Sequence, residues 1–214
     1  MGERTDYVTY VHQVYDYLHT IPEKGFEEFK TSAFVLEELK KIGFEDIKTG
    51  VAGTGIIVTI DSGKEGPVLG LRADMDALEF IIDGKKTMIH ACGHDGHTSM
   101  LLAAAREIHD RDLVKKGKLK IIFQPGEERL YGALRMIDSG LLDDVEEIVG
   151  MHLRPKQDCR LGKAIPAMYH CASCIMEFTI KGVTCHGSKP HLGVNVVDAA
   201  SLAVQAINAI RVNP

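Results

Sequence analysis

The sequence lacks an excess of positive charge. Its 25 lysines and arginines are outnumbered by 30 aspartates and glutamates, which gives a formal net charge of −5 at pH 7. Proteins that bind nucleic acid or an anionic membrane surface typically carry a basic patch, which this balance does not favour. We therefore expect no nucleic-acid partner and no membrane partner.

Long hydrophobic runs are also missing. No segment approaches the roughly 20 apolar residues that span a bilayer. Residues 1–12 are polar and lack the apolar core of a signal peptide. These two absences favour a cytoplasmic protein.

Cysteine is scarce, and its count is odd. The chain is too long to need disulfide bonds for its stability, so the cysteines are interpreted as free thiols or metal ligands. They are Cys92, Cys159, Cys171, Cys174 and Cys185.

The hydrophobic pattern alternates between helix and strand periods. It predicts helices over 5–18, 27–42, 95–109 and 129–139, and strands over 54–60, 67–73, 119–123 and 147–151, the first two strands as neighbours. Nearly continuous apolar strands that alternate with helices are buried on both faces. We therefore expect an α/β fold with a mostly parallel sheet covered by helices.

The length of 214 residues suits one large domain or one and a half, at roughly 150 residues per domain. Residues 157–167 show little periodicity, so we place a domain junction near residue 168. The predicted domains are 1–167 and 168–214. The second begins with a strand over 172–180 and a helix over 194–210, the start of a smaller α+β unit.

Four polar clusters stand directly after predicted strands or just beyond them. They are Asp74 with Asp76, the segment HACGHDGH over 90–97, Glu127 with Glu128, and His152. In open α/β sheets the functional crevice lies at the carboxyl ends of the strands. Residues that are far apart in the sequence would therefore converge on one site.

The residue types in these clusters are those that bind metals. One glycine separates Cys92 from His94, so a thiolate and an imidazole can face a common point, a pair suited to zinc or a similar divalent ion. Of the two adjacent glutamates, one can bind metal while the other holds a proton. Together with His152 they form an incomplete ligand set for two metals roughly 3.5–4 Å apart.

Each cluster taken alone has a simpler interpretation. The histidine-rich segment is typical of a polar loop or a helix cap. The glutamates suit the first turn of a helix, where the helix dipole favours carboxylates, and a lone histidine after a strand is usually structural. Only the occurrence of all these clusters in one chain favours a dinuclear metal site.

Four segments together resemble the successive motifs of a known family. The segments are LRADMDAL (71–78), HACGHDGH (90–97), QPGEE (124–128) and MH (151–152). They are similar to the motifs of the aminoacylase, hippurate hydrolase and indole-acetyl-amino-acid hydrolase family of metallopeptidases. The motifs occur in the same order and cover essentially the whole chain. The resemblance implies a metal-dependent amidohydrolase that cleaves the amide bond of small N-acyl amino acids. It also implies two divalent ions, zinc or else manganese, cobalt or nickel, and a homo-oligomer.

The resemblance further implies roles for individual residues. Cys92 would bridge the two metals, with His94, Glu128 and His152 as terminal ligands. Glu127 would be the general base, and Asp76 would orient a ligand without binding metal itself.

The loop VTCHGSKPH (183–191) resembles part of the family's lid and dimerisation domain. The resemblance therefore makes 1–167 the metal-binding catalytic domain and 168–214 the beginning of the lid. His186 would stabilise the oxyanion of the substrate; the alternative is an exposed loop histidine with no such role.

Four departures accompany the resemblance. Glu79 stands where the family usually has proline, the loop before His90 is short, and Cys171 and Cys174 form a CxxC that we interpret as structural. Family members also continue beyond this point and supply a last histidine ligand that this sequence does not contain. The alternative to an amidohydrolase is therefore a catalytically incomplete fragment that binds metal and oligomerises.

Overall fold

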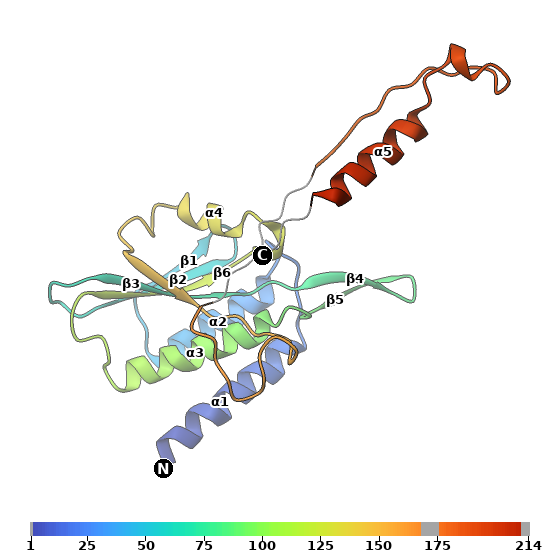
Figure 1. Cartoon of the computed structure of the whole chain (residues 1–214). Helices are drawn as coiled ribbons and strands as arrows, with labels where there is room; N and C mark the ends of the chain where they lie inside the picture. Colours follow the sequence, from blue (N-terminus) through green and yellow to red (C-terminus); the bar gives the residue numbers. More distant parts are fainter. Residues whose placement is uncertain (1, 168–175, 211–214) are drawn as a thin grey trace. The chain divides into compact units, whose positions relative to one another are not determined.

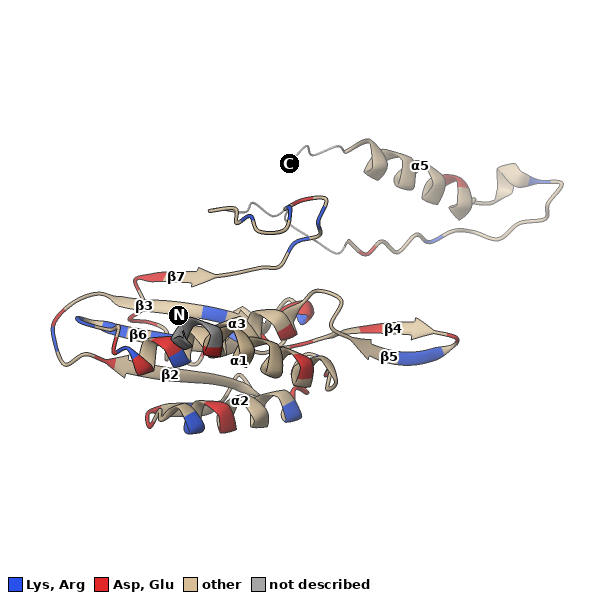
Figure 2. Ribbon diagram, turned by 90° about the horizontal axis from the view of Figure 1, so that it is seen from below, with Lys and Arg blue, Asp and Glu red and all other residues tan. Residues whose placement is uncertain are grey.

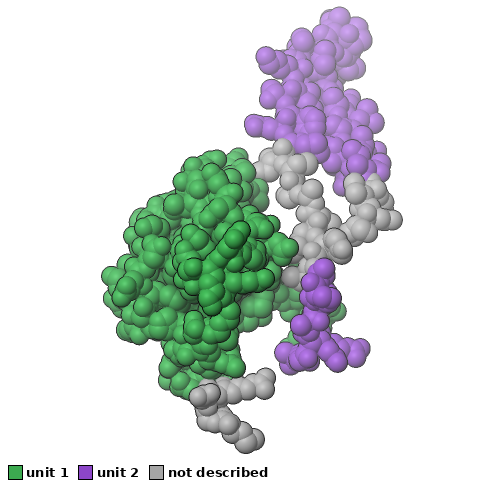
Figure 3. Space-filling model, turned by 90° about the vertical axis from the view of Figure 1, so that its left-hand side faces the viewer, with its two compact units in different colours: residues 1–158 green, residues 159–214 purple. Residues whose placement is uncertain are grey.

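The computed structural model describes residues 2–167 and 176–210 and forms two compact units, Met1–Asp158 and Cys159–Pro214 (Figure 3). The predicted domain junction near residue 168 and the pair Cys171 and Cys174 lie outside the described residues, so both interpretations stay predictions. Unit 1 contains every predicted metal ligand and the predicted general base, whereas His186 belongs to unit 2.

Unit 1 is built on a five-stranded sheet. Its strands, in spatial order, are β1 (Ile47–Val51), β2 (Gly55–Asp61), β6 (Lys118–Gln124), β3 (Val68–Asp74) and β7 (Glu147–Gly150). The pairs β1–β2 and β2–β6 are antiparallel, and β3 runs parallel to both β6 and β7. The predicted α/β fold is confirmed; the sheet, expected to be mostly parallel, is mixed, with two parallel and two antiparallel pairings.

The prediction that the first two strands of the pattern are neighbours is wrong. β6 lies between β2 and β3 and pairs with both. All residues of β6 except Lys118 are buried. The most completely buried strand therefore lies at the centre of the sheet, where side chains on both faces are covered.

Three helices cover one face of this sheet and a short helix covers the other (Figure 1). The three are α1 (Gly2–His19), α2 (Phe29–Ile42) and α3 (His94–Asp110), and the short one is α4 (Gly132–Ile137). All four predicted helices of this part of the chain are confirmed, with ends that differ from the predicted ones by a few residues.

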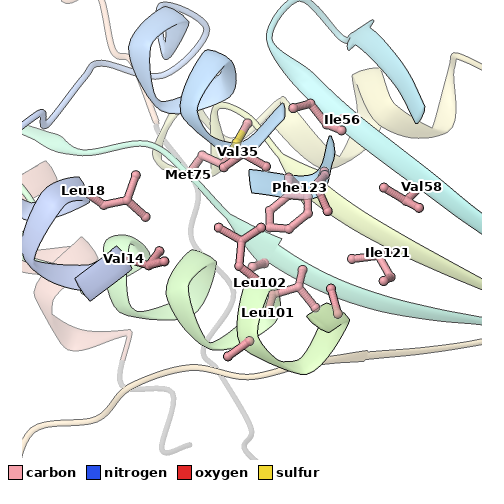
Figure 4. Close-up of a cluster of buried hydrophobic side chains, with 14 of the residues drawn as sticks. Val14, Leu18, Val35, Ile56, Val58, Met75, Leu101, Leu102, Ile121 and Phe123 are labelled. Atoms are coloured by element: carbon pink, nitrogen blue, oxygen red, sulfur yellow. The ribbon is translucent and has the colours of Figure 1, made fainter. Parts of the chain in front are cut away.

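Alternate side chains of the central strand belong to two cores. Ile121 and Phe123 of β6 share a cluster with Leu102 of α3 (Figure 4), whereas Ile122 packs with Met136 of α4 on the other face. Full burial of such a side chain stabilises the fold by roughly 1.5–3 kcal/mol. The sheet is thereby fixed from both sides and can hold the loops at its edge in place.

A two-stranded hairpin that was not predicted occupies the short segment before His90. β4 (Leu78–Ile82) pairs antiparallel with β5 (Lys85–Ile89), and the hairpin extends away from the main sheet (Figure 2). Asp83 and Gly84 connect the strands with φ angles of 50° and 73°. An Asp-Gly pair between β-rich runs is a hairpin signal in the sequence, because both turn positions require positive φ.

Unit 2 contains α5 (Val196–Ala209), which confirms the predicted helix; the Val197 N–H donates to the side chain of Asn195 at its start. Residues 176–180, the described part of the strand predicted over 172–180, form no strand. A strand needs a hydrogen-bonded neighbour, and the described residues of unit 2 offer only the bridge between Val183 and Val194. No helix within the described ranges is long and apolar enough to cross a membrane.

Candidate metal centre

The carboxyl ends of three parallel strands meet at one edge of the sheet. β3 ends at Asp74, which is in register with Gln124 at the end of β6, and β7 lies on the other side of β3. The residues that follow these ends include Asp76, Glu127 and His152, and α3 begins at His94 close to them. Parallel pairing is thus what gathers polar residues from distant parts of the sequence.

His94 is fully buried at the middle of this group. Three carboxylate oxygens surround its Nε2 atom, those of Asp74 at 3.7 Å and of Glu127 and Glu128 at 3.9 Å each. Its Nδ1 atom lies 3.2 Å from Asp76 Oδ1. An ionised carboxylate can only accept, so Nδ1 carries the proton of a neutral ring and the lone pair of Nε2 points toward the carboxylates.

The Nε2 atom of His94 has no hydrogen-bond partner among the described residues. A buried polar atom without a partner is unfavourable, and a cation between Nε2 and the carboxylates would remove that cost. Burial acts to lower the pKa of His94, but the hydrogen bond to Asp76 and the nearby carboxylates outweigh it and raise that pKa. The site therefore attracts positive charge, whether as a proton or as a metal ion.

Cys92 and His152 complete the group on its other side. The Cys92 Sγ atom lies 3.4 Å from His152 Nε2, and the Nδ1 atom of the same ring lies 2.6 Å from the carbonyl oxygen of Leu153. A carbonyl only accepts, so Nδ1 carries the proton and Nε2 faces the sulfur. Burial, followed by the carboxylates of Glu128 and Glu127, raises the pKa of the Cys92 thiol to about 12. A bound cation reverses this effect, because a metal-coordinating thiol is deprotonated.

Three overlapping sets of side chains bring potential ligand atoms within 4.8 Å of one another. All three sets include His94. The first adds Cys92 and His152, the second adds Asp74 and His97, and the third adds Glu127 and Glu128. The four ligands predicted from the sequence are thus brought together around one buried imidazole. Their binding of metal stays a proposal.

Asp76 contacts the site through its carboxylate, which is almost completely buried. It accepts from the backbone N–H of Glu127 at 3.1 Å and of Glu128 at 3.0 Å, in addition to its contact with His94. One carboxylate therefore orients three other residues of the group. This arrangement suits the predicted role of Asp76 as a residue that positions ligands.

His97 and Asp74 link the end of β3 to the segment of His152. The Leu153 N–H donates to His97 Nε2 at 2.8 Å, and His97 Nδ1 lies 2.6 Å from Asp74 Oδ1. Because Nε2 accepts, Nδ1 must be the donor, and neither nitrogen of His97 is left for a cation. Burial acts to raise the pKa of Asp74, but the His97 hydrogen bond and the Arg72 guanidinium outweigh it and lower that pKa to about 2.

The remaining polar residues of the histidine-rich segment are Asp95, in the first turn of α3, and His90, four residues before that helix. Asp95 accepts from its neighbouring Gly96 N–H at 2.8 Å, and its other oxygen lies 2.6 Å from His19 Nδ1. These contacts fit the simpler interpretation of Asp95 as a carboxylate at a helix start. His90 is buried, and neither of its ring nitrogens has a hydrogen-bond partner within the described part of the chain.

His186, the predicted oxyanion stabiliser, lies on an exposed loop of unit 2. Its Nδ1 atom is 2.8 Å from the Ser188 hydroxyl and also accepts from the Ser188 N–H at 3.2 Å. Its ring is therefore held locally, and its predicted role stays a proposal.

The motifs that surround this site define a family. The sequence profile described as peptidase family M20/M25/M40 matches residues 70–210. The chain belongs to this family. The match spans both units, and it confirms the resemblance that the four motifs indicate.

Two curated relatives and one solved M20 structure illustrate the match. The N-acetyl-L-cysteine deacetylase of Bacillus subtilis (strain 168) is 36% identical over 212 residues, which cover 92% of this chain and 50% of the relative. The hippurate hydrolase of Campylobacter jejuni is 34% identical over 202 residues, with coverage of 90% and 52%. A dinuclear metal-binding M20 peptidase of Bacillus subtilis superposes with a TM-score of 0.63 and 33% identity over 71% of this chain and 44% of that chain. The M20 chain described here spans about half the length of the curated relatives it matches.

Proposed function

We propose that this chain is part of a metal-dependent amidohydrolase that cleaves the amide bond of small N-acyl amino acids. The observation that carries the proposal is the convergence of a thiol, two imidazoles and two carboxylates at the strand ends, around a buried imidazole nitrogen that lacks a partner. N-acetyl-L-cysteine deacetylase and hippurate hydrolase, the relatives named above, are both hydrolases of N-acylated amino acids.

The donor set fits two divalent ions. These ions would be held by Cys92, His94, Glu128 and His152. A set of sulfur, nitrogen and oxygen donors suits zinc, with manganese, cobalt and nickel as alternatives. When bound, such ions polarise the scissile carbonyl and lower the pKa of a water molecule toward ~7. Asp76 and Asp74, the latter through His97, would keep the ligands in place.

Glu127 is the proposed general base. Its side chain is 41% exposed, compared with 23% for Glu128, so the first is better placed to meet substrate and the second to bind metal. Burial, followed by the neighbouring charges of Asp74 and Glu128, raises the pKa of Glu127. A carboxylate with a raised pKa can take a proton from the attacking water and return it to the leaving amine. His186 of unit 2 would stabilise the oxyanion of the tetrahedral intermediate.

A second candidate function is a metal-binding protein whose main role is association. It is favoured by α5, in which no side chain is buried although the helix is rich in apolar residues. The two candidates differ in whether hydrolysis depends on Glu127.

The test measures metal content and hydrolysis together. We expect about two divalent ions per chain, and hydrolysis of at least one member of a panel of N-acetyl, N-benzoyl and indole-acetyl amino acids that stops when a chelator is added. The Glu127→Gln variant should retain its metal and lose about 10²–10⁴-fold in kcat, the usual contribution of a general base. A variant with undiminished turnover would refute the role of Glu127, and a metal-loaded protein inactive on the whole panel would favour the second candidate.

A further inference from the structure

Glu28 is a fully buried glutamate that lies immediately before α2, far from the metal ligands in the sequence. Its Oε1 atom accepts from the Gly126 N–H at 2.8 Å, and its Oε2 atom accepts from the Thr54 hydroxyl at 2.5 Å. A buried carboxylate is unfavourable unless hydrogen bonds replace the water it has lost. Both of its oxygens have such partners, and one partner is the residue that precedes the two glutamates of the site.

Two buried carboxylates bind the backbone of the turn that carries these glutamates. Glu28 accepts from Gly126, and Asp76 accepts from Glu127 and Glu128. Three successive N–H groups therefore donate to two acidic side chains that come from different parts of the sequence. Hydrogen bonds to an ionised acceptor are shorter and stronger than neutral ones.

The turn leaves little freedom for another arrangement. Gly126 has a φ of +61°, and a Cβ atom at this position would lie 2.6 Å from the ring of Phe26, two residues before Glu28. On the other side, the Ser32 hydroxyl donates to the Thr54 carbonyl at 2.7 Å, and the Thr54 hydroxyl holds Glu28. The loop before α2, together with Ser32 of α2, thus restricts the position of the turn at 126–128.

We propose that Glu28 is a positioning residue that, together with Asp76, fixes the turn at 126–128 so that the carboxylates of Glu127 and Glu128 face His94. The inference rests on the proposed function, since it assigns Glu28 to the support of the same metal centre. Removal of the carboxylate leaves the buried Gly126 N–H without its acceptor. The turn then loses one of its two anchors, and the two glutamates lose their common orientation.

The experiment compares Co²⁺ binding by the wild-type chain and variants, through affinity and the visible d–d spectrum. Glu28→Ala should weaken Co²⁺ binding by about 10–100-fold, as loss of ligand-supporting contacts does, and should alter the spectrum. Glu28→Gln should stay close to wild type, because its amide oxygen can accept from Gly126 while its NH₂ group donates to Thr54. Thr54→Val, which keeps the volume but removes the hydroxyl, should weaken binding by about 2–10-fold, the loss of one hydrogen bond.

Tyr10→Phe is the matched control. It removes the 2.8 Å hydrogen bond between two other buried side chains, Tyr10 and Glu38, which join α1 to α2 away from the site. It should lower stability without changing Co²⁺ affinity. If Tyr10→Phe weakened Co²⁺ binding as much as Glu28→Ala does, the effect would be general destabilisation and the inference would be overturned.

Amide hydrogen exchange at residues 126–128 separates this inference from the proposed function. Exchange at these three residues should accelerate in the metal-free Glu28→Ala and Thr54→Val variants, whereas exchange in β6 should stay as in the wild-type chain. Unchanged protection in both variants overturns the inference, even if the wild-type chain binds Co²⁺. Failure of the wild-type chain to bind Co²⁺ overturns the proposed function.

Discussion

At the scale of single residues, adjacent side chains of the same type have different environments. Glu127 and Glu128 follow one another, yet the first is the more exposed, and burial together with neighbouring charge raises its pKa. Their backbone N–H groups share the acceptor Asp76. Two carboxylates whose backbone shares one anchor thus differ in exposure, and the proposed difference in their roles rests on this.

Glu28 gives a prediction for the pH dependence of stability. Burial raises the pKa of its carboxyl above the ordinary value, against the opposing effect of its hydrogen bonds. Below the ordinary pKa, Glu28 is protonated in both the folded and the unfolded states. As the pH rises toward the folded-state pKa, the unfolded state releases its proton first. The free energy of unfolding therefore falls over this pH range. Glu28→Gln cannot titrate, so its stability relative to wild type should increase from about pH 4 toward neutrality.

Urea unfolding of wild type and Glu28→Gln at a series of pH values measures this difference. Glu23→Gln provides a comparison, because Glu23 caps the start of α2 through the Lys30 and Thr31 N–H groups and is not fully buried. A difference between Glu28→Gln and wild type that stays constant across the range would contradict the predicted pKa shift.

At the scale of elements, β7 needs support from outside the sheet. It pairs only with β3 among the described strands, and all of its residues are exposed. The segment after it carries His152, and the Leu153 N–H is bound to His97 of α3. The position of His152 therefore depends on a helix as well as on its own strand.

The variant His97→Phe tests this link. Phenylalanine fills a similar space but cannot accept from the Leu153 N–H or donate to Asp74, so His152 loses its fixed position. We expect metal affinity to fall by about 10–100-fold, which isothermal titration with Zn²⁺ would measure. His109→Phe, on the far end of α3 and half exposed, should bind Zn²⁺ as wild type does. Equal affinities of His97→Phe and wild type would show that the link is dispensable.

Hydrophobic periodicity predicts most elements of unit 1 but not their pairing. Each predicted strand of the main sheet exists, because a run of apolar residues marks burial on both faces. The order of the strands depends on which strand is most completely buried. The short connection between β2 and β3 suggests that these two strands are neighbours, although β6 lies between them. The β-rich segment 172–180 has strand periodicity, but its described residues lack a neighbour with which to pair.

At the scale of the whole molecule, the residues of the candidate site can be predicted from the sequence more readily than the residues that hold them in position. Three clusters, those of Asp74, Glu127 and His152, are visible in the sequence because each stands at or shortly after the end of a strand in the parallel part of the sheet. The segment 90–97 instead follows β5 of the hairpin. Glu28 gives no such signal, because in the sequence it is one of two adjacent glutamates at a helix start. Its contact with Gly126 joins residues that are 98 positions apart. Contacts of this kind depend on how loops meet in three dimensions, which periodicity does not encode.

The exposed apolar residues of α5 predict self-association. Val197 and Val204 are each more than half exposed, and their spacing of seven residues places both on one face of α5. A contiguous apolar surface is usually covered by another protein surface, and a homo-oligomer would provide one. Analytical ultracentrifugation should show concentration-dependent association that Val204→Glu shifts toward the monomer, without loss of metal from unit 1. Ile81→Glu, on the exposed β4–β5 hairpin, should leave the association unchanged. A wild-type chain that stays monomeric at every concentration would contradict the prediction.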